Sequence, residues 1–195
     1  WTCLGFYCLW STGLCEVSKP IFIDRALSDP NRPQSDLKLD LYRHPAEVLM
    51  LTNIRPGMHV ADLMAGSGWY TEILSRVVGP TGLVYVQNNR ISTQNYGNAL
   101  TYRLESSNLG NVVRIDQELE ELRLPPHAID IVFLVQFYHD TYWMGVDRVR
   151  MNQNIYQALK AGGVYCVIDH RAEANTGSRD TKYLHRVDPT IVKDE

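Results

Sequence analysis

The chain has 195 residues, of which 45% are hydrophobic and 21% are charged. This length and balance suit one globular domain with a sizeable core and leave little room for two. The formal net charge of −3 offers no broad basic surface of the kind that neutralises phosphates. The composition therefore argues against a nucleic-acid partner and favours a small-molecule substrate.

The N-terminal residues 1–15 are uncharged and largely apolar, yet too few to span a bilayer as a helix. They are compatible with the remnant of a secretory or lipoprotein-like leader, a docked strand or helix, or a chain end without chemical importance. We divide the chain into a leader or docking segment, residues 1–24, and a domain, residues 25–195. We expect a cytoplasmic location, with secretion, a periplasmic location or membrane contact only if the first segment is a leader or anchor.

Beyond the polar, proline-punctuated residues 28–45, which we expect to wrap the domain, short apolar runs alternate with helical patterns. A first helix begins near residue 46 and ends at Arg55-Pro56-Gly57, since proline and glycine both oppose its continuation. The expected strands are residues 58–63, 83–87, 112–115, 129–135 and 164–168, and the expected helices are 70–78, 96–106 and 147–159. Glycine-containing turns at residues 79–82 and 160–163 join helices to strands.

These strands are apolar on both faces, which indicates a parallel sheet covered by helices on both sides. The fold class predicted is α/β with a doubly wound sheet. Near the end of the chain, Asp188 followed by Pro189 is typical of a capped helix start.

The loop after the first strand carries the sequence DLMAGSGWYT at residues 62–71. Open α/β sheets bind ligands at this position, and glycine lets the backbone approach a ligand closely. The third glycine of a dinucleotide-binding loop is replaced here by Thr71, and Ser67 has the wrong spacing for a hydrolase nucleophile. A simple tight turn is the plain alternative.

The sequence PGMHVADLMAGSGWYTEIL at residues 56–74, with LKAGG at 159–163, DHR at 169–171 and LHR at 184–186, resembles the predicted class I S-adenosylmethionine-dependent methyltransferases. The resemblance covers the chain from about residue 25. It implies a Rossmann-like, mostly parallel sheet and S-adenosylmethionine as the cofactor. Such enzymes carry a C-terminal antiparallel hairpin that five strands do not provide, so the domain is expected to be C-terminally incomplete.

The same resemblance assigns residues around the cofactor. Met64 departs from it, because most relatives have glycine there, and amides replace the acidic residue that usually holds the ribose hydroxyls. An amide both donates and accepts hydrogen bonds and can bind a diol, without the strength of a carboxylate. The residues expected to bind the cofactor are Asp62, Ala65, Gly66, Gly68, Tyr70, Gln87, Asn88, Asp116 and Gln136.

The segment QFYHDTYW at residues 136–143 follows the fourth strand and combines aromatic and titratable groups. His139 is the candidate catalytic base, with Asp140 beside it, because an unperturbed imidazole titrates near neutral pH. The alternative is that both residues only cap the next helix. The residues expected to shape the substrate pocket are Tyr138, Trp143 and His170.

Three histidines, His139, His170 and His185, together with Asp140 and Asp169, would be adequate metal ligands. Their spacing does not demand a metal, and none is predicted. The leading hypothesis is transfer of a methyl group from S-adenosylmethionine to a small-molecule acceptor. The alternatives are a non-catalytic S-adenosylmethionine-binding or interaction module and, less favoured, hydride transfer.

Strand five, residues 164–168, is expected to lie at an edge of the sheet. An apolar edge with open backbone donors and acceptors pairs readily with other chains, so it needs a cover. Residues 4–10, a neighbouring subunit in a homo-oligomer, or residues outside this chain are the three covers considered.

Overall fold

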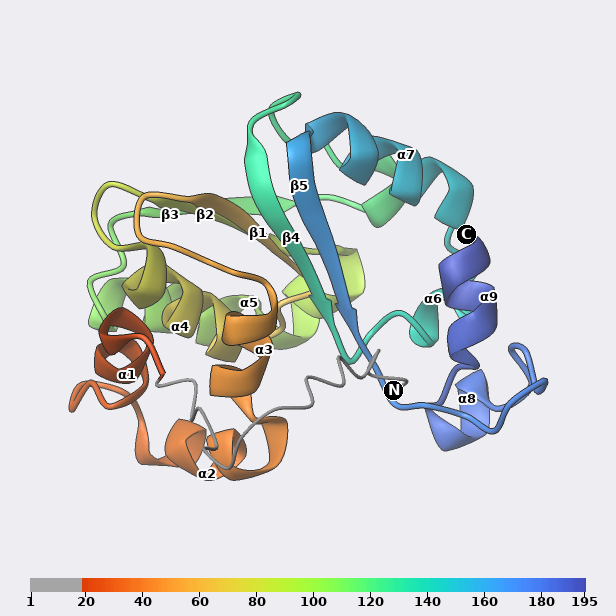
Figure 1. The fold of residues 1–195 in the computed structure, drawn as a ribbon, viewed down its shortest axis with the longest axis horizontal. Coiled ribbons are helices and arrows are strands. Elements are labelled where there is room, and N and C mark those ends of the chain that lie inside the picture. The colour runs from red at the N-terminus through yellow and green to blue at the C-terminus, as the bar shows by residue number, and fades with distance from the viewer. Residues whose placement is uncertain (1–18) are drawn as a thin grey trace, which may run out of the picture.

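The computed structural model describes residues 19–195, and the expectations for residues 1–18 lie outside that range. Five strands form one parallel sheet in the order β3-β2-β1-β4-β5, with helices against both faces (Figure 1). The strands are β1 (His59–Leu63), β2 (Leu83–Asn88), β3 (Val112–Asp116), β4 (Ile129–Val135) and β5 (Leu159–Ile168). The predicted doubly wound α/β fold is confirmed, and each strand overlaps the apolar run that predicts it, although β5 begins at Leu159 rather than at residue 164.

The central strand β1 shows why both faces of the sheet are apolar. Val60 lies opposite Val84 on one side and Ile131 on the other, and Ala61 and Leu63 point to the opposite face. Because successive side chains of a strand alternate between faces, two cores form. One lies under helices α1 (Ile21–Leu27), α3 (Pro45–Leu51) and α4 (Trp69–Val78), and the other lies under α7 (Arg148–Ala158) and η1 (Leu119–Glu121).

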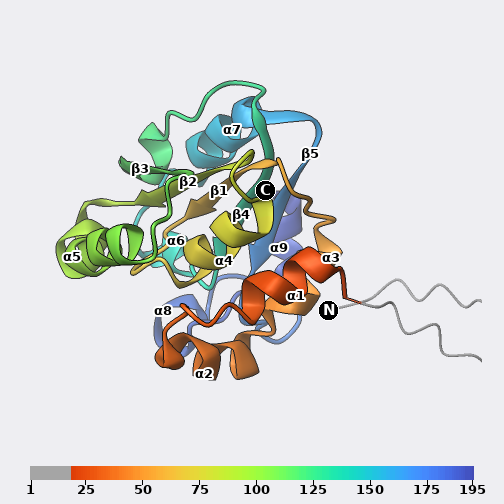
Figure 2. The same ribbon diagram turned by 90° about the vertical axis from the view of Figure 1, so that its left-hand side faces the viewer.

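The N-terminal lead-in is more regular than the sequence indicates. Residues 28–45 contain the helix α2 (Gln34–Arg43), which follows Pro33, and α3 ends at Leu51, before the Arg55-Pro56-Gly57 stop. In Figure 2, α1, α2 and α3 lie together below the sheet as drawn. Similarly, α5 (Arg90–Ser106) begins at Arg90 rather than residue 96, because Asn89 caps it by accepting a hydrogen bond from the Ser92 amide.

The turn expected at residues 160–163 lies within β5 as a bulge. Leu159 pairs with Ile129 and Val164 with Ile131, so the residues between them loop out, and Lys160 pairs with Asp130 at 2.8 Å. After β5 come α8 (Thr181–Leu184) and α9 (Pro189–Asp194). The predicted cap of the last helix is present, since Asp188 Oδ1 accepts a hydrogen bond from the Thr190 amide at 2.9 Å.

Strand β5 lies at an edge of the sheet, as predicted. A groove of about 1130 Å³ runs along it between α7 and α9. Residues 4–10, one of the three covers considered for this edge, lie outside the described range. Within residues 19–195, no helix is both long and apolar enough to cross a membrane.

Candidate functional site

The loop after β1 has a tightly specified backbone. Met64, Gly66 and Gly68 all have positive φ, at 53°, 59° and 82°. A Cβ on Gly68 would lie 2.7 Å from Leu100 Cδ1, and together with its positive φ this favours glycine there. At Gly66 the nearest atom to such a Cβ is 3.9 Å away, on Tyr96, so its backbone faces open space that a ligand can enter.

Met64 occupies the left-handed region without being glycine, which costs about 1–2 kcal/mol. Two contacts offset this strain. Its amide donates to Gln87 Oε1 at 3.0 Å, and its side chain is buried in the core that η1 covers. Met64 can therefore adopt the same loop conformation that a glycine at this position would adopt.

Gln87 and Asn88, the amides at the end of β2, hold this loop. Asn88 forms a two-point pair with the Gly66 backbone: its Oδ1 accepts from the Gly66 amide, and its Nδ2 donates to the Gly66 carbonyl, both at 2.9 Å. An amide oxygen has two lone pairs and its nitrogen two protons. Asn88 therefore uses one acceptor and one donor position on the loop, and because the residue is only 1% exposed, fixing the loop is the role that the structure shows for it.

Asp62, at the end of β1, is buried, and its Oδ2 accepts a 2.6 Å hydrogen bond from the Thr71 hydroxyl. Burial raises the pKa of this carboxyl to about 7, although its hydrogen bonds with Thr71 oppose the shift. A cation bound nearby would favour the charged carboxylate. Asp62 is therefore suited to respond to a positively charged ligand in the loop.

Tyr70 is the second residue of α4. Its ring lies between the ring of Trp69, stacked at a centroid distance of 5.3 Å, and the ring of Phe133, edge-on at 5.3 Å. Its hydroxyl is buried and has no hydrogen-bond partner. Burial also raises the pKa of this hydroxyl well above its ordinary value, so it stays a donor. Leaving a buried polar group unsatisfied costs about 1–3 kcal/mol, which marks this hydroxyl as a contact for a polar ligand.

A cavity of about 140 Å³ adjoins Tyr70 at the carboxyl ends of β4 and β5. That volume accommodates the reactive end of a small molecule rather than a whole cofactor, since sites for complete drug-sized ligands are about 300–1,000 Å³. Its walls are aromatic and polar, and α2 and α3 close one side. The lining residues are Tyr42, Arg43, Val48, Trp69, Tyr70, Val135, Gln136, Ile168, Asp169 and His170.

A buried ionic network, which the sequence analysis did not identify, fixes α2 over the loop. Arg103 of α5 donates to Asp36 of α2 at 2.5 Å, to Glu72 of α4 at 2.6 Å and to the Ser67 carbonyl at 2.8 Å. Glu72 also binds Arg76 at 2.7 Å. The sequence offered one signal for this network: Glu72 lies among apolar residues of a helix, and a buried carboxylate must be paired.

His139 lies at the start of α6 (Asp140–Trp143), and its ring is oriented by Asp169. Nδ1 lies 2.7 Å from Asp169 Oδ1, and the His139 amide donates to Asp169 Oδ2 at 2.8 Å. Burial would lower the pKa of His139, but this hydrogen bond and the charges of Asp169 and Asp140 outweigh it, so the pKa lies above its ordinary value. The other ring nitrogen, Nε2, lies 3.0 Å from Asp140 Oδ1 and 3.1 Å from His185 Nδ1.

The remaining predicted residues are divided between two regions. Gln136 and His170 line the small cavity, and Trp143 donates to Asp140 Oδ1 at 2.9 Å beside His139. Tyr138 points away, into the core under α7, where its hydroxyl donates to Glu195 Oε2 at 2.7 Å. The structure thus does not bring Tyr138 to the small cavity, and neither Tyr138 nor His139 is among its lining residues.

At the end of β3, Asp116 pairs with Asn88 in the strand register, and its Oδ1 accepts from the Thr93 hydroxyl at 3.2 Å and from Arg114. Ala65 donates to the Gln87 carbonyl at 3.1 Å. The assignments of individual site residues all stay predictions. What the structure adds is that these residues lie at or just after the carboxyl ends of three adjacent strands, β1, β2 and β3. They are Asp62, Gly66, Asn88 and Asp116.

Comparison with known proteins finds similarity to curated methyltransferases. The chain is 25% identical over 123 residues to the ubiquinone/menaquinone biosynthesis C-methyltransferase UbiE of Pseudoalteromonas translucida, covering 63% of this chain and 47% of that protein. It is 30% identical over 116 residues to UbiE of Vibrio vulnificus, covering 59% and 42%. The chain thus spans about half the length of the curated relatives it matches. No family model matches the sequence.

Solved structures agree on the fold. A SAM-dependent methyltransferase from Aquifex aeolicus superposes with a TM-score of 0.60 at 22% identity, covering 75% of this chain and 77% of that one. The [4+2]-cyclase SpnF superposes with a TM-score of 0.56 at 17% identity, covering 77% and 52%. The sequence-based recognition of a class I S-adenosylmethionine-dependent methyltransferase domain is confirmed by the fold and by the similarity to curated methyltransferases.

Proposed function

We propose that this domain binds S-adenosylmethionine at the loop after β1 and transfers its methyl group to a small-molecule acceptor held at the carboxyl ends of β4 and β5. The observation that carries the proposal is the loop Met64–Gly68: its open backbone at Gly66 is fixed from the end of β2 by Asn88. Sequence similarity to proteins named methyltransferases supports the same cofactor.

The residues of the loop fit this cofactor. S-adenosylmethionine supplies a methyl group on a positively charged sulfonium. Asp62 provides a carboxyl whose ionised form a nearby cation favours, and Tyr70 provides a buried donor without a partner. Because methyl transfer is an in-line displacement, the main task of the protein is to hold donor and acceptor in one line.

The acceptor side is the small cavity beside Tyr70. Its aromatic lining, with Tyr42 and Trp69, favours a planar acceptor, and the relatives named above carry out C-methylation in quinone biosynthesis by name. In this proposal His139 is the base for an acceptor that must lose a proton: Asp169 holds Nδ1, so the proton goes to Nε2 once His185 moves from its 3.1 Å contact with that atom.

The binding step is tested by calorimetry with S-adenosylmethionine and S-adenosylhomocysteine. Gly66→Asn is the test variant, because asparagine tolerates positive φ better than most residues and adds a side chain on the open face of the loop. Gly177→Asn is the control, since Gly177 has a similar φ of 57° and nothing within 4 Å of its added Cβ. We expect Gly66→Asn to lower cofactor affinity at least 10-fold and Gly177→Asn to leave it unchanged.

Turnover is tested separately by screening metabolites for release of S-adenosylhomocysteine. If neither adenosyl compound binds at millimolar concentration, the proposal fails at its first step. Binding without release of product from any acceptor would instead support the non-catalytic cofactor-binding module. The fold alone does not establish methyl transfer, because a protein named as a [4+2]-cyclase has a similar fold.

A further inference from the structure

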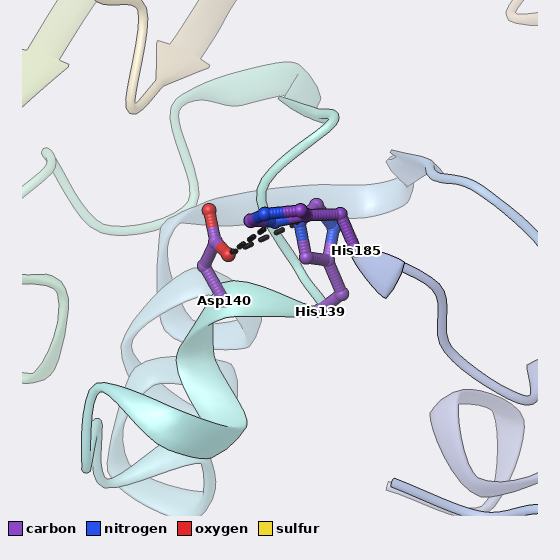
Figure 3. A group of neighbouring side chains, drawn as sticks. All are labelled: His139, Asp140 and His185. Carbon is purple, nitrogen blue, oxygen red and sulfur yellow. Dashed lines mark hydrogen bonds and ion pairs between the residues drawn. The ribbon is translucent and has the colours of Figure 1, made fainter. Parts of the chain in front are cut away.

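Three side-chain atoms converge beside the start of α6: His139 Nε2, Asp140 Oδ1 and His185 Nδ1 (Figure 3). His139 Nε2 lies 3.0 Å from Asp140 Oδ1 and 3.1 Å from His185 Nδ1, and the last two atoms are 3.5 Å apart. His139 and Asp140 follow β4, whereas His185 follows α8 in the long connection after β5. The group therefore joins two loops that are far apart in sequence.

Hydrogen bonds satisfy this triangle only when His139 carries a second proton. A neutral His139 whose Nδ1 donates to Asp169 presents a lone pair at Nε2, and Asp140 presents lone pairs at Oδ1. A proton on His185 Nδ1, or a second proton on His139, serves one edge of the triangle at a time. With His139 neutral, the edge from Nε2 to Asp140 remains a contact between two lone pairs; with His139 protonated, Nε2 donates to Asp140 and that edge is an ion pair. A cation at the centre is attracted by all three atoms at once.

The dimensions suit a transition metal. Zinc binds histidine nitrogen and carboxylate oxygen at about 2.0–2.2 Å, so two ligand atoms of a tetrahedral site lie about 3.3 Å apart. The three observed separations, 3.0, 3.1 and 3.5 Å, bracket that value. Two imidazoles among three ligands favour zinc and its neighbours over magnesium or calcium, which prefer oxygen.

The surroundings also match a metal site. Histidine ligands of metals commonly donate their other ring nitrogen to a carboxylate, which fixes the ring and its tautomer. Asp169 holds His139 in this way at 2.7 Å, and the Trp143 indole donates to Asp140 Oδ1 at 2.9 Å and fixes the carboxylate. His139 is buried, while the side chain of His185 is 58% exposed, so the group is accessible from solvent.

We propose that His139, Asp140 and His185 bind one Zn²⁺ ion with water in the fourth position, joining the turn after β4 to the connection after β5. This site does not depend on methyl transfer. It does exclude one assignment made above: while Nε2 of His139 binds the metal, it cannot serve as a base. The metal-loaded protein would then orient or polarise an acceptor atom through the open position instead.

The experiment titrates metal-free protein with ZnCl₂ against a chromophoric chelator, without S-adenosylmethionine present, so that failure of the cofactor proposal does not affect the result. We expect one tight site per chain. His185→Asn should weaken it at least 100-fold. His44→Asn is the matched control, because both histidines have positive φ, 50° and 46°, and similar side-chain exposure, 58% and 65%. Asparagine tolerates that backbone conformation, so both variants should fold.

Asp169→Asn tests the orienting role and should weaken zinc binding about 10–100-fold, as loss of such a partner commonly does. Equal zinc affinity in the wild type and His185→Asn would overturn the proposal, and so would an equal loss in His44→Asn. Cobalt provides a second readout: visible absorption typical of a four-coordinate site should form in the wild type and be absent from His185→Asn. A six-coordinate cobalt spectrum in both proteins would contradict the site.

Discussion

Replacing Arg103 with methionine tests the buried ionic network that holds α2 against the loop. Arg103 is mostly buried, with 12% of its side chain exposed, and it contacts two carboxylates that are 5% and 0% exposed, Asp36 and Glu72. Glu72 retains Arg76 after the substitution, but Asp36 loses its guanidinium partner. Removing one partner of a buried ion pair commonly costs about 3–5 kcal/mol, because it leaves a buried charge uncompensated.

The expected result is that Arg103→Met lowers the free energy of unfolding by about 3–5 kcal/mol in urea denaturation followed by circular dichroism. Arg114→Met is the matched control. Arg114 pairs with Asp116 at 3.0 Å near the surface, where such pairs contribute about 0–1 kcal/mol. Asp36→Asn combined with Arg103→Met removes the uncompensated charge and should recover part of the loss.

The double variant also guards against the case in which Arg103→Met alone does not fold. A loss for Arg103→Met no larger than that for Arg114→Met would refute the reasoning, since it would mean that the network contributes only as a surface pair does. Because Arg103 also binds the Ser67 carbonyl at 2.8 Å, a folded variant should bind S-adenosylmethionine more weakly.

Two further predictions concern the cofactor loop. Tyr70→Phe removes a buried hydroxyl without a partner, so the free energy of unfolding measured in urea should rise by about 1 kcal/mol or more. Affinity for the adenosyl ligand or the acceptor should fall. A fall in both the free energy of unfolding and the affinity would contradict the assignment of this hydroxyl to a ligand. Asp62 has its pKa raised from 3.8 to about 7, so between those pH values the folded chain holds a proton that the unfolded chain has lost. The free energy of unfolding should therefore fall as pH rises through that window, by at most about 1.4 kcal/mol per pH unit, and less steeply in Asp62→Asn. Identical slopes for the two proteins in urea titrations would show that Asp62 does not titrate there.

The sheet could be predicted because its strands are short, apolar on both faces and bounded by glycine or proline. The turn at residues 79–82 and the cap at Asp188 are local signals that tertiary structure did not override. Helix α2 was missed because its residues are mostly polar and its buried face is held by charge: Asp36 and Asp40 bind Arg103 and Arg32 rather than contributing apolar packing. A helix of this kind shows no helical periodicity of apolar residues in the sequence.

For the site, the sequence could predict which residues lie at the carboxyl ends of the strands. Residues that follow β1, β2 and β3 do gather at one edge, since parallel strands carry their carboxyl ends to the same side. Side-chain direction was not predictable: Tyr138 and His139 are neighbours, yet Tyr138 enters the core under α7 and His139 faces Asp169. Which of the histidines approaches His139 depends on the left-handed turn at His185, a conformation that the sequence did not indicate.

The pairing of Asn88 with both backbone groups of Gly66 has a kinetic consequence for ligand capture. A flexible glycine loop must lose conformational entropy when its ligand arrives, and that loss weakens binding. Here the loop becomes ordered when the domain folds, because a side chain from the neighbouring strand already satisfies its hydrogen bonds. Encounter with an adenosyl compound then resembles docking onto a rigid surface, with an association rate set by diffusion and orientation rather than by waiting for a rare loop conformation.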